Sequence, residues 1–334
     1  MNVGLCFNLK KSLKDPGADD LYAEWDDEET IEAVRSALAR QHRVHLIEGN
    51  EEAFEKLHRL RPDIVFNIAE GLYGASRELQ IPAMLEMLRI PYTGSDPLTL
   101  ALCLDKSLTK EILGYHGVPT PPFRAMENLK KIDDLPSFPL IVKPLWEGSS
   151  KGIGNKALVR TAKQLREQVA TILTRYHQPA LVEKYLPGRE FTVALLGNGN
   201  GLEILPIVEI QFDQLPADIN PIYSYEAKWI WDTAEKPLEI FTCPAKVSLH
   251  LRRKIQSVCQ AAFLALRCRD WCRIDVRLDA SNRPHIMELN PLPGILPRPE
   301  QNSCFPKAAR AAGLSFQELI NTVLDLACKR YGME

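Results

Sequence analysis

The sequence lacks the features that mark several broad classes of protein. No apolar run is long enough to span a membrane, and the first residues are too weakly apolar for a signal peptide. The 41 basic residues do not exceed the 43 acidic ones, so nothing indicates nucleic acid. The eight cysteines show no CxxC spacing, and we expect reduced thiols in a cytoplasmic protein. No internal repeat and no Walker A phosphate-binding pattern occur.

The first part of the chain alternates strand and helix patterns. Its 334 residues predict two or three lobes, and residues 1–95 predict a doubly wound parallel sheet of class α/β. Ligands of such sheets bind beyond the carboxyl ends of the strands, where Asn67–Gly74 carries Glu70. An ordinary turn explains this loop equally well. The predicted strands are 2–7, 43–47 and 63–68, and the predicted helices are 26–40, 51–60 and 79–88.

A loop rich in glycine and serine follows a predicted strand in the middle of the chain. A continuous helix is predicted for 96–113, and then a strand over 138–142 ends at Lys143. Trp146–Gly154 follows, and its N–H groups and hydroxyls could surround a polyphosphate with Lys143 beside it. A plain hairpin loop is the alternative. Further predictions are a helix over 161–175, strands over 180–185, 191–196 and 203–210, and helices over 246–266, 306–312 and 315–329.

Two alternating runs near the C-terminus, CRIDVRL and PHIMELN, predict a hairpin. Alternation places Arg273 and Asp275 on one face of the first strand, and Glu288 and Asn290 on one face of the second. Two carboxylates and an amide oxygen suit Mg²⁺, and an arginine beside them suits phosphate or an oxyanion. A solvated polar face is the alternative, but it does not explain the Asn290-Pro291 break behind Glu288.

The order of these pieces resembles the ATP-grasp superfamily, and within it the D-alanine–D-alanine ligases. The resemblance extends over nearly the whole chain and is carried by LDKSLTK, FPLIVKPLWEGSSKGI, YEAKW, CPA, LNPLPG and FPKAARAAGLSFQELI in family order. It implies an ATP-grasp fold with an N-terminal domain (1–95), a small lobe (96–186) and a large lobe (187–334) that enclose ATP. It also implies an ATP-dependent ligase with Mg²⁺ as two ions, for which Mn²⁺ can substitute.

The resemblance assigns roles to individual residues. Lys106, Lys143 and Lys228 would contact phosphates, and Ser149 and Ser150 would lie in the loop that closes over them. Arg273, with the Gly294 N–H and Ser149, would serve catalysis. The adenine edge and ribose would be held by Glu183, Lys184, Tyr185, Leu186 and Glu190, and the metal ions by Asp275, Glu288 and Asn290.

The sequence departs from the family in both substrate regions. Glu70 replaces a histidine of the family, and Arg77 appears close to it. Trp229 replaces a tyrosine, and the segment that would bind the second substrate's carboxylate is lengthened to 297–303, where Arg298 and Ser303 could serve. In the region of a substrate-holding family glutamate, only Glu24 offers a stand-in. Two further basic residues, Lys151 and Arg189, are interpreted as solvated surface.

We therefore expect a carboxylate–amine ligase that forms a peptide-like bond through an acyl phosphate and releases ADP and phosphate. A carboxylate needs such activation because oxide is a poor leaving group. The altered pockets predict substrates other than two D-alanines. The alternatives are a true D-alanine–D-alanine ligase of peptidoglycan synthesis and a non-catalytic ATP-binding protein. We expect small-molecule partners, neither nucleic acid nor membrane, and a homodimer by family habit.

Overall fold

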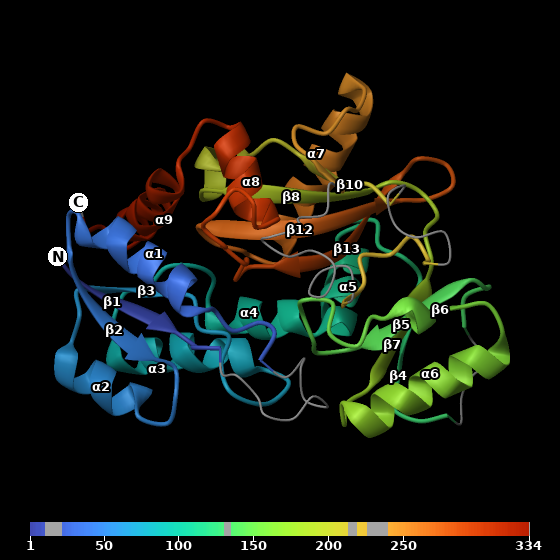
Figure 1. Cartoon of the computed structure of the whole chain (residues 1–334), viewed down its shortest axis with the longest axis horizontal. Helices are drawn as coiled ribbons and strands as arrows, with labels where there is room; N and C mark the ends of the chain where they lie inside the picture. Colours follow the sequence, from blue (N-terminus) through green and yellow to red (C-terminus); the bar gives the residue numbers. More distant parts are fainter. Residues whose placement is uncertain (11–21, 130–134, 213–218, 226–239, 334) are drawn as a thin grey trace.

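A computed structural model shows three sheets in the described part of the chain (Figure 1). It describes residues 1–334 except for 11–21, 130–134, 213–218, 226–239 and 334. The polar segment 9–20, for which the sequence predicts a loop, lies largely outside the described residues, and Lys228 and Trp229 lie wholly outside them. No helix among the described residues is long and apolar enough to cross a membrane.

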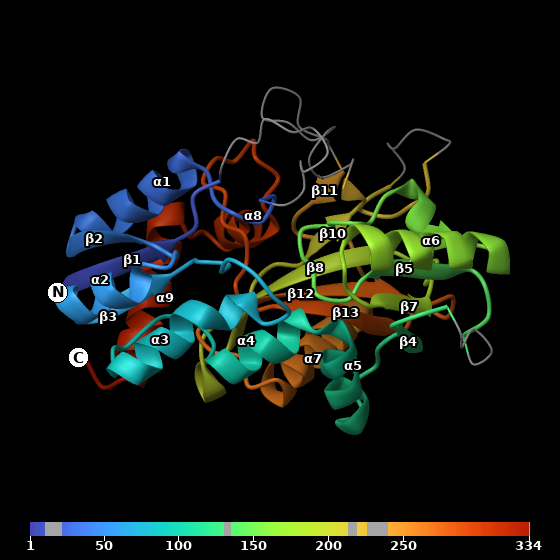
Figure 2. The ribbon, with the colours of Figure 1, turned by 90° about the horizontal axis from the view of Figure 1, so that it is seen from below.

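The first sheet is parallel, as its alternating pattern predicted, with strand order β2-β1-β3. Because side chains alternate along each strand, one face packs on helices α1 and α9 and the other on α2 and α3 (Figure 2). The strands are β1 (Asn2–Phe7), β2 (Arg43–Glu48) and β3 (Ile64–Asn67), and the helices are α1 (Glu28–Ala39), α2 (Ala53–Leu60), α3 (Gln80–Leu88) and α9 (Phe316–Arg330).

The small lobe is a four-stranded antiparallel sheet with one long helix packed on it. Its strand order is β4-β7-β5-β6, and the helix contributes three buried apolar residues one or two turns apart, Leu165, Val169 and Ile172. The sequence patterns missed β4 and β6. The elements are β4 (Phe123–Met126), β5 (Leu140–Pro144), β6 (Leu158–Val159), α6 (Ala162–Arg175) and β7 (Ala180–Lys184).

The large lobe is a mainly antiparallel sheet of order β11-β10-β8-β12-β13, with β9 paired to β8. The predicted continuous strand over 203–210 is wrong, because β9 and β10 pair with different parts of β8 and residues between them leave the ladder. The elements are β8 (Glu190–Leu196), β9 (Glu203–Ile204), β10 (Val208–Ile210), β11 (Phe241–Thr242), α7 (Leu249–Ala265), β12 (Trp271–Leu278), β13 (Pro284–Asn290) and α8 (Cys304–Ala311).

The predicted continuous helix over 96–113 is also wrong. It is broken at Asp105, whose ψ of 99° is extended, into α4 (Pro97–Leu104) and α5 (Lys106–Tyr115). The Asp105 carboxylate accepts hydrogen bonds from the backbone N–H groups of Ser107 and Leu108 and so caps α5. This break makes Lys106 the first residue of a helix that faces the interior.

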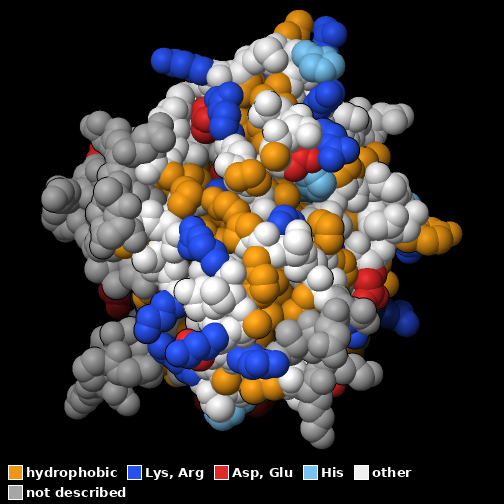
Figure 3. All heavy atoms as spheres, turned by 90° about the vertical axis from the view of Figure 1, so that its right-hand side faces the viewer, with side chains coloured by type: hydrophobic (Ala, Val, Ile, Leu, Met, Phe, Trp, Pro, Cys, Tyr) orange, Lys and Arg blue, Asp and Glu red, His pale blue; other side chains and the backbone are white. Residues whose placement is uncertain are grey.

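The first sheet and the large lobe share one hydrophobic core. Trp271 of β12 packs edge-on against Phe66 of β3 and Phe305 of α8, with ring centroids 5.7 and 5.8 Å apart. The small lobe keeps a separate core. At the small-lobe end, Lys and Arg side chains are scattered between hydrophobic ones and form no continuous stripe on that face (Figure 3).

Candidate functional site

The β12–β13 hairpin brings four polar side chains to one face of the large-lobe sheet. Arg273 lies opposite Asn290, and Asp275 lies opposite Glu288. A register shift directly after Asp275 bends the ladder at this point, as β-bulges do near functional sites. The pairing is the one that the alternating sequence predicted.

The carboxylates of the hairpin are held by cations. Arg273 donates two hydrogen bonds to Asp275, at 3.1 and 3.0 Å, and Lys106 Nζ lies 3.6 Å from Glu288. Burial alone would raise the pKa of Glu288, but the charges of Lys106, Lys143 and Arg273 lower it to about 2. Glu288 is therefore an ionised oxygen donor at neutral pH.

A cavity of about 410 Å³ lies between the hairpin, the small lobe and the first domain. It is lined by loops of the first domain and by residues of the small and large lobes, among them many that the sequence singled out. The predicted site residues that line it are Glu70, Lys106, Lys143, Ser149, Ser150, Glu183, Glu190, Arg273, Asp275, Glu288, Asn290, Gly294 and Ser303.

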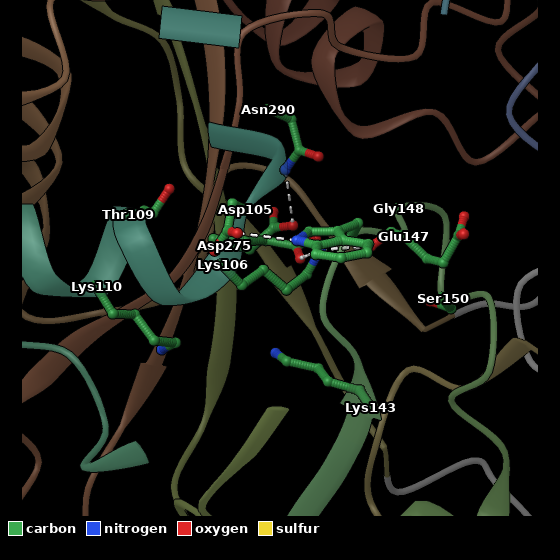
Figure 4. Close-up of polar contacts among 12 residues, drawn as sticks. Asp105, Lys106, Thr109, Lys110, Lys143, Glu147, Gly148, Ser150, Asp275 and Asn290 are labelled. Carbon is green, nitrogen blue, oxygen red and sulfur yellow. Dashed lines mark hydrogen bonds and ion pairs between the residues drawn. The ribbon is translucent and has the colours of Figure 1, made fainter. Parts of the chain in front are cut away.

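Two lysines enter the cavity region from different elements, Lys106 from the start of α5 and Lys143 from β5 (Figure 4). Lys143 Nζ lies 2.7 Å from Glu183, whose other oxygen lies 2.9 Å from Lys110 Nζ. Glu183 is fully buried, and these two cations outweigh burial and lower its pKa. The sequence analysis missed Lys110, which lies on α5 one turn after Lys106.

The loop after β5 reaches over the cavity with two serines in the left-handed region. Ser149 and Ser150 have φ of 49° and 60°, a conformation that residues with a Cβ rarely adopt and that is common at functional sites. The Ser150 hydroxyl donates to the carbonyl of Tyr223 at 2.9 Å. The Lys106 ammonium donates to the carbonyl of Glu147, which joins the loop to α5.

Only some of the residues expected around adenine and ribose line the cavity. Glu190 lines the cavity and pairs with Arg277 at 2.7 Å, a buried arginine that the sequence analysis missed. Arg277 also donates to the Tyr185 hydroxyl, and the Lys184 ammonium donates to the carbonyl of Ser137. Neither Lys184, Tyr185 nor the buried Leu186 is among the cavity-lining residues.

Three residues expected near the substrates have different surroundings. Ser303 lines the cavity, and its hydroxyl donates to the Gly294 carbonyl at 3.0 Å. Arg298 is more than half exposed and pairs with Glu29 of α1, outside the cavity wall. Arg77 is buried, is absent from the cavity wall, and bonds to Glu24 and to the loop after β5.

The interpretation of Lys151 as solvated surface is wrong. Its side chain is 6% exposed and pairs with Glu147 at 2.6 Å and Glu24 at 3.5 Å. The charge at Glu147, four residues earlier, was the only local signal, since Glu24 is 127 positions away. Arg189 is partly exposed and pairs with Glu209.

Carboxyl groups form the first-domain wall of the cavity. Glu70, Glu78 and Asp26 line it, and within the described chain none of these three side chains has a hydrogen bond or ion pair. Burial raises the pKa of Asp26 to about 8 and that of Glu78 to about 7, and burial with the neighbouring carboxyls raises that of Glu70. This wall favours a ligand group with positive charge.

The donor set of the hairpin fits a hard divalent cation only in part. No group of three His, Cys, Asp or Glu side chains placed to hold a metal ion occurs among the residues described. Asp275, Glu288 and Asn290 supply two carboxylates and one amide, so phosphate oxygens or water would have to complete the shell. Opposite Asp275 on β8, the buried Thr192 hydroxyl belongs to a residue that lines the cavity, and it has no hydrogen-bond partner among the described residues.

Comparisons with known proteins agree with the fold. The family model described as the D-ala D-ala ligase C-terminus matches residues 116–325. The D-alanine–D-alanine ligase of Bordetella avium is 34% identical, covering 89% of this chain and 88% of its own. The uncharacterized protein y4sG of Sinorhizobium fredii is 40% identical, covering 92% and 90%. The ATP complex of a Bacillus anthracis D-alanine–D-alanine ligase superposes with TM-score 0.71, 23% identity and 99% coverage of each chain.

Proposed function

Because the chain belongs to the D-alanine–D-alanine ligase family of ATP-grasp enzymes, which are ATP-dependent ligases, we propose that it joins a carboxylate substrate to an amine substrate. In this proposal the two substrates are not both D-alanine. The reaction would proceed through an acyl phosphate of the carboxylate substrate and release ADP and phosphate. The predicted family and fold are confirmed by the relatives and structural neighbours. The proposal includes a cytoplasmic location and a homodimer.

The carboxyl wall of the cavity is the observation that carries the choice of substrate. Asp26, Glu70 and Glu78 lie where buried carboxyls cost free energy unless a cation joins them. One ammonium group, as in D-alanine, could pair with at most one of these three carboxyls and favour its ionised form. A substrate with more than one amine, such as a diamino acid or a polyamine, fits this wall better.

The nucleotide would lie against the small lobe. Lys106 and Lys143 would contact its phosphates from two directions, with Lys228 as a third proposed contact. Ser149 and Ser150 would cover the phosphates from the loop. The adenine edge would contact Glu183, Lys184, Tyr185 and Leu186. The ribose would contact Glu190, whose carboxylate would then bind both the ribose and Arg277.

The hairpin would hold the metal and stabilise charge. Asp275, Glu288 and Asn290 would bind two Mg²⁺ ions, or Mn²⁺ in their place, together with phosphate oxygens, and the bound metal would neutralise phosphate charge during phosphoryl transfer. Arg273, already desolvated, would donate to the oxyanion that forms when the amine attacks, and the Gly294 N–H would add a second donor. The loop would keep water away from the acyl phosphate, which water would hydrolyse.

A true D-alanine–D-alanine ligase is the second candidate function. The 34% identity to the Bordetella avium enzyme over most of both chains favours it. The Arg298, Ser303 and Trp229 positions, proposed to contact substrate, would then have to accommodate D-alanine.

The experiment measures ADP and phosphate released with magnesium and ATP over single and paired D- and L-amino acids, diamino acids and polyamines. We expect release that requires two different compounds, one of them with an extra amine, and an amide product by mass spectrometry. D-Alanine alone as the best substrate would support the second candidate and contradict the first. The Arg273→Ala variant controls for contaminating ATPase activity.

A further inference from the structure

Four buried charges meet where the loop after β5 touches the first domain. Glu24 and Arg77 come from the first domain, and Glu147 and Lys151 come from the loop. We call them the four-charge cluster. None of these side chains is more than 14% exposed, and the two cations balance the two anions. A buried set of this kind fixes geometry, because the loss of one member leaves another charge unpaired.

Arg77 bonds both to the first domain and to the loop. Its Nη1 donates to the carbonyl of Trp146 at 2.8 Å, and its Nη2 donates to Glu24 at 2.6 Å and reaches Glu147 at 3.3 Å. Its own backbone is fixed by Gly71, whose φ is +82° and where a Cβ would lie 2.1 Å from the Arg77 carbonyl oxygen. The guanidinium therefore bonds the loop backbone and is committed away from the cavity.

The Glu24 carboxylate hydrogen-bonds to the loop directly. One of its oxygens accepts a hydrogen bond from the Gly148 N–H at 2.6 Å, and the other accepts from Arg77. A Cβ on Gly148 would lie 2.4 Å from the Glu24 carboxylate, so a side chain there would displace Glu24 from this contact. Burial would raise the pKa of Glu24, but Arg77, Lys151 and these hydrogen bonds lower it to about 2.

The four-charge cluster is continuous with the proposed phosphate site. The next two residues after Gly148 are Ser149 and Ser150, which line the cavity, and Lys106 donates to the Glu147 carbonyl. Gln178 ties the Glu147 carboxylate and the Trp146 N–H from the other side, at 2.8 and 2.7 Å. The loop is thus held at both its backbone and its side chains.

We propose that Arg77 is a positioning residue that, with Glu24, Glu147 and Lys151, holds the loop Trp146–Gly152 over the cavity and couples the first domain to it. Arg77 then acts through the loop, without touching a substrate carboxylate. The part of this inference that concerns catalysis rests on the proposed function, because only a ligase has an acyl phosphate to protect.

The first test needs no substrate. Hydrogen exchange of residues 146–151 is measured in the whole protein for wild type, Arg77→Met, Arg77→Lys and Gly148→Ala, with and without Mg-ADP. We expect at least tenfold faster exchange in Arg77→Met, partial rescue in Arg77→Lys, and several-fold weaker Mg-ADP binding by calorimetry in Arg77→Met. The matched control is Arg189→Met, which removes a two-pronged pair with Glu209. Neither residue lines the cavity, and we expect this variant to leave exchange of the loop unchanged.

Gly148→Ala and Lys151→Met decide the matter if Arg77→Met does not fold. Gly148→Ala keeps all four charges and displaces only the Glu24 contact, so it also should speed exchange of the loop. Loop exchange equal to wild type in these folded variants overturns the proposal.

The second test separates this inference from the proposed function. With the best substrate pair, the ratio of phosphate released to amide formed is near one in wild type and rises several-fold in Arg77→Met, because water reaches the acyl phosphate. A wild type that makes no amide, but whose loop responds to Arg77→Met, refutes only the function. A ligase with unchanged loop exchange and unchanged ratio in Arg77→Met refutes only the positioning role.

Discussion

Arg273 is committed by its neighbours to a single direction. It is held by a forked pair with Asp275 and lies 3.9 Å from Glu288, and it comes from the middle of a buried ladder. A donor fixed in this way needs no reorganisation when an oxyanion forms, which is the physical basis of electrostatic catalysis.

Replacement of Arg273 should therefore affect chemistry more than binding. We expect Arg273→Ala to lower kcat by about 10²–10³-fold while Mg-ADP affinity, measured by calorimetry, changes little. Arg273→Lys keeps the charge but not the planar fork and should recover only part of the rate. Wild-type turnover in Arg273→Ala would contradict this role.

Asp26 predicts a pH dependence of stability. Burial, with the charge of Asp27, raises its pKa from 3.8 to about 8 in the folded state, so the folded state holds a proton that the unfolded state releases. The free energy of unfolding of wild type should then fall as pH rises from about 4 to about 8. Asp26→Asn lacks this loss and should be more stable than wild type near pH 8 by on the order of 1–2 kcal/mol, but not near pH 4. Urea unfolding at several pH values tests this, and a difference independent of pH would exclude it.

At the scale of elements, the break between α4 and α5 rests on one side chain. Asp105 caps α5 and also accepts a hydrogen bond from the Trp146 indole at 2.9 Å. Both the helix start and the loop after β5 therefore depend on the same carboxylate.

Asp105→Ala should cost about 1–2 kcal/mol in unfolding free energy, the usual loss for a helix N-cap. It should also weaken Mg-ADP binding, because it shifts Lys106 at the first turn. Asp105→Asn keeps a capping oxygen and serves as the matched control. Equal stability of the two variants, measured by thermal unfolding, would show that the cap contributes little.

The elements show which parts of the fold can be predicted from local sequence. The hairpin was predictable because its period-two alternation is a property of neighbouring residues in CRIDVRL and PHIMELN. The break at Asp105 was not, because apolar residues continue across it and the Asp105 carboxylate is held by Trp146, 41 residues later in the chain. The short strands β4 and β6 exist mainly because β7 and β5 offer them free edges.

At the scale of the whole molecule, the predictable and unpredictable parts of the site separate by sequence distance. The order of motifs along the chain indicated the family and the hairpin, lysine and serine residues that line the cavity. The burial of Lys151 and Glu24, and the bonds of Arg277 to Glu190, join positions 87 to 127 residues apart. Such contacts leave no periodic signal in a single sequence, so Lys151 was assigned to the surface.

The shared core predicts cooperative unfolding of the first domain and the large lobe. Phe305→Ala removes a fully buried ring beside Trp271 and should cost about 3–5 kcal/mol. The loss should appear equally in hydrogen exchange of β1 and of β12, because both elements pack into this core. Phe54→Ala, at a ring that is 37% exposed, is the control and should change stability by less than about 1 kcal/mol. Destabilisation of β12 alone would show that the two sheets unfold separately.

The separation of cores has a mechanical consequence. The first sheet and the large-lobe sheet are joined by Trp271, Phe66 and Phe305, whereas the small lobe has its own core. We therefore expect the first domain and the large lobe to move as one rigid body, and the small lobe to move relative to it. The hydrogen bond from Arg77 to the loop after β5 links the two parts. The distance between labels placed on α2 and α7 should not change when nucleotide binds. The distance between labels on α2 and α6 should change. The free energy of that change should depend on the contact of Arg77 with the loop.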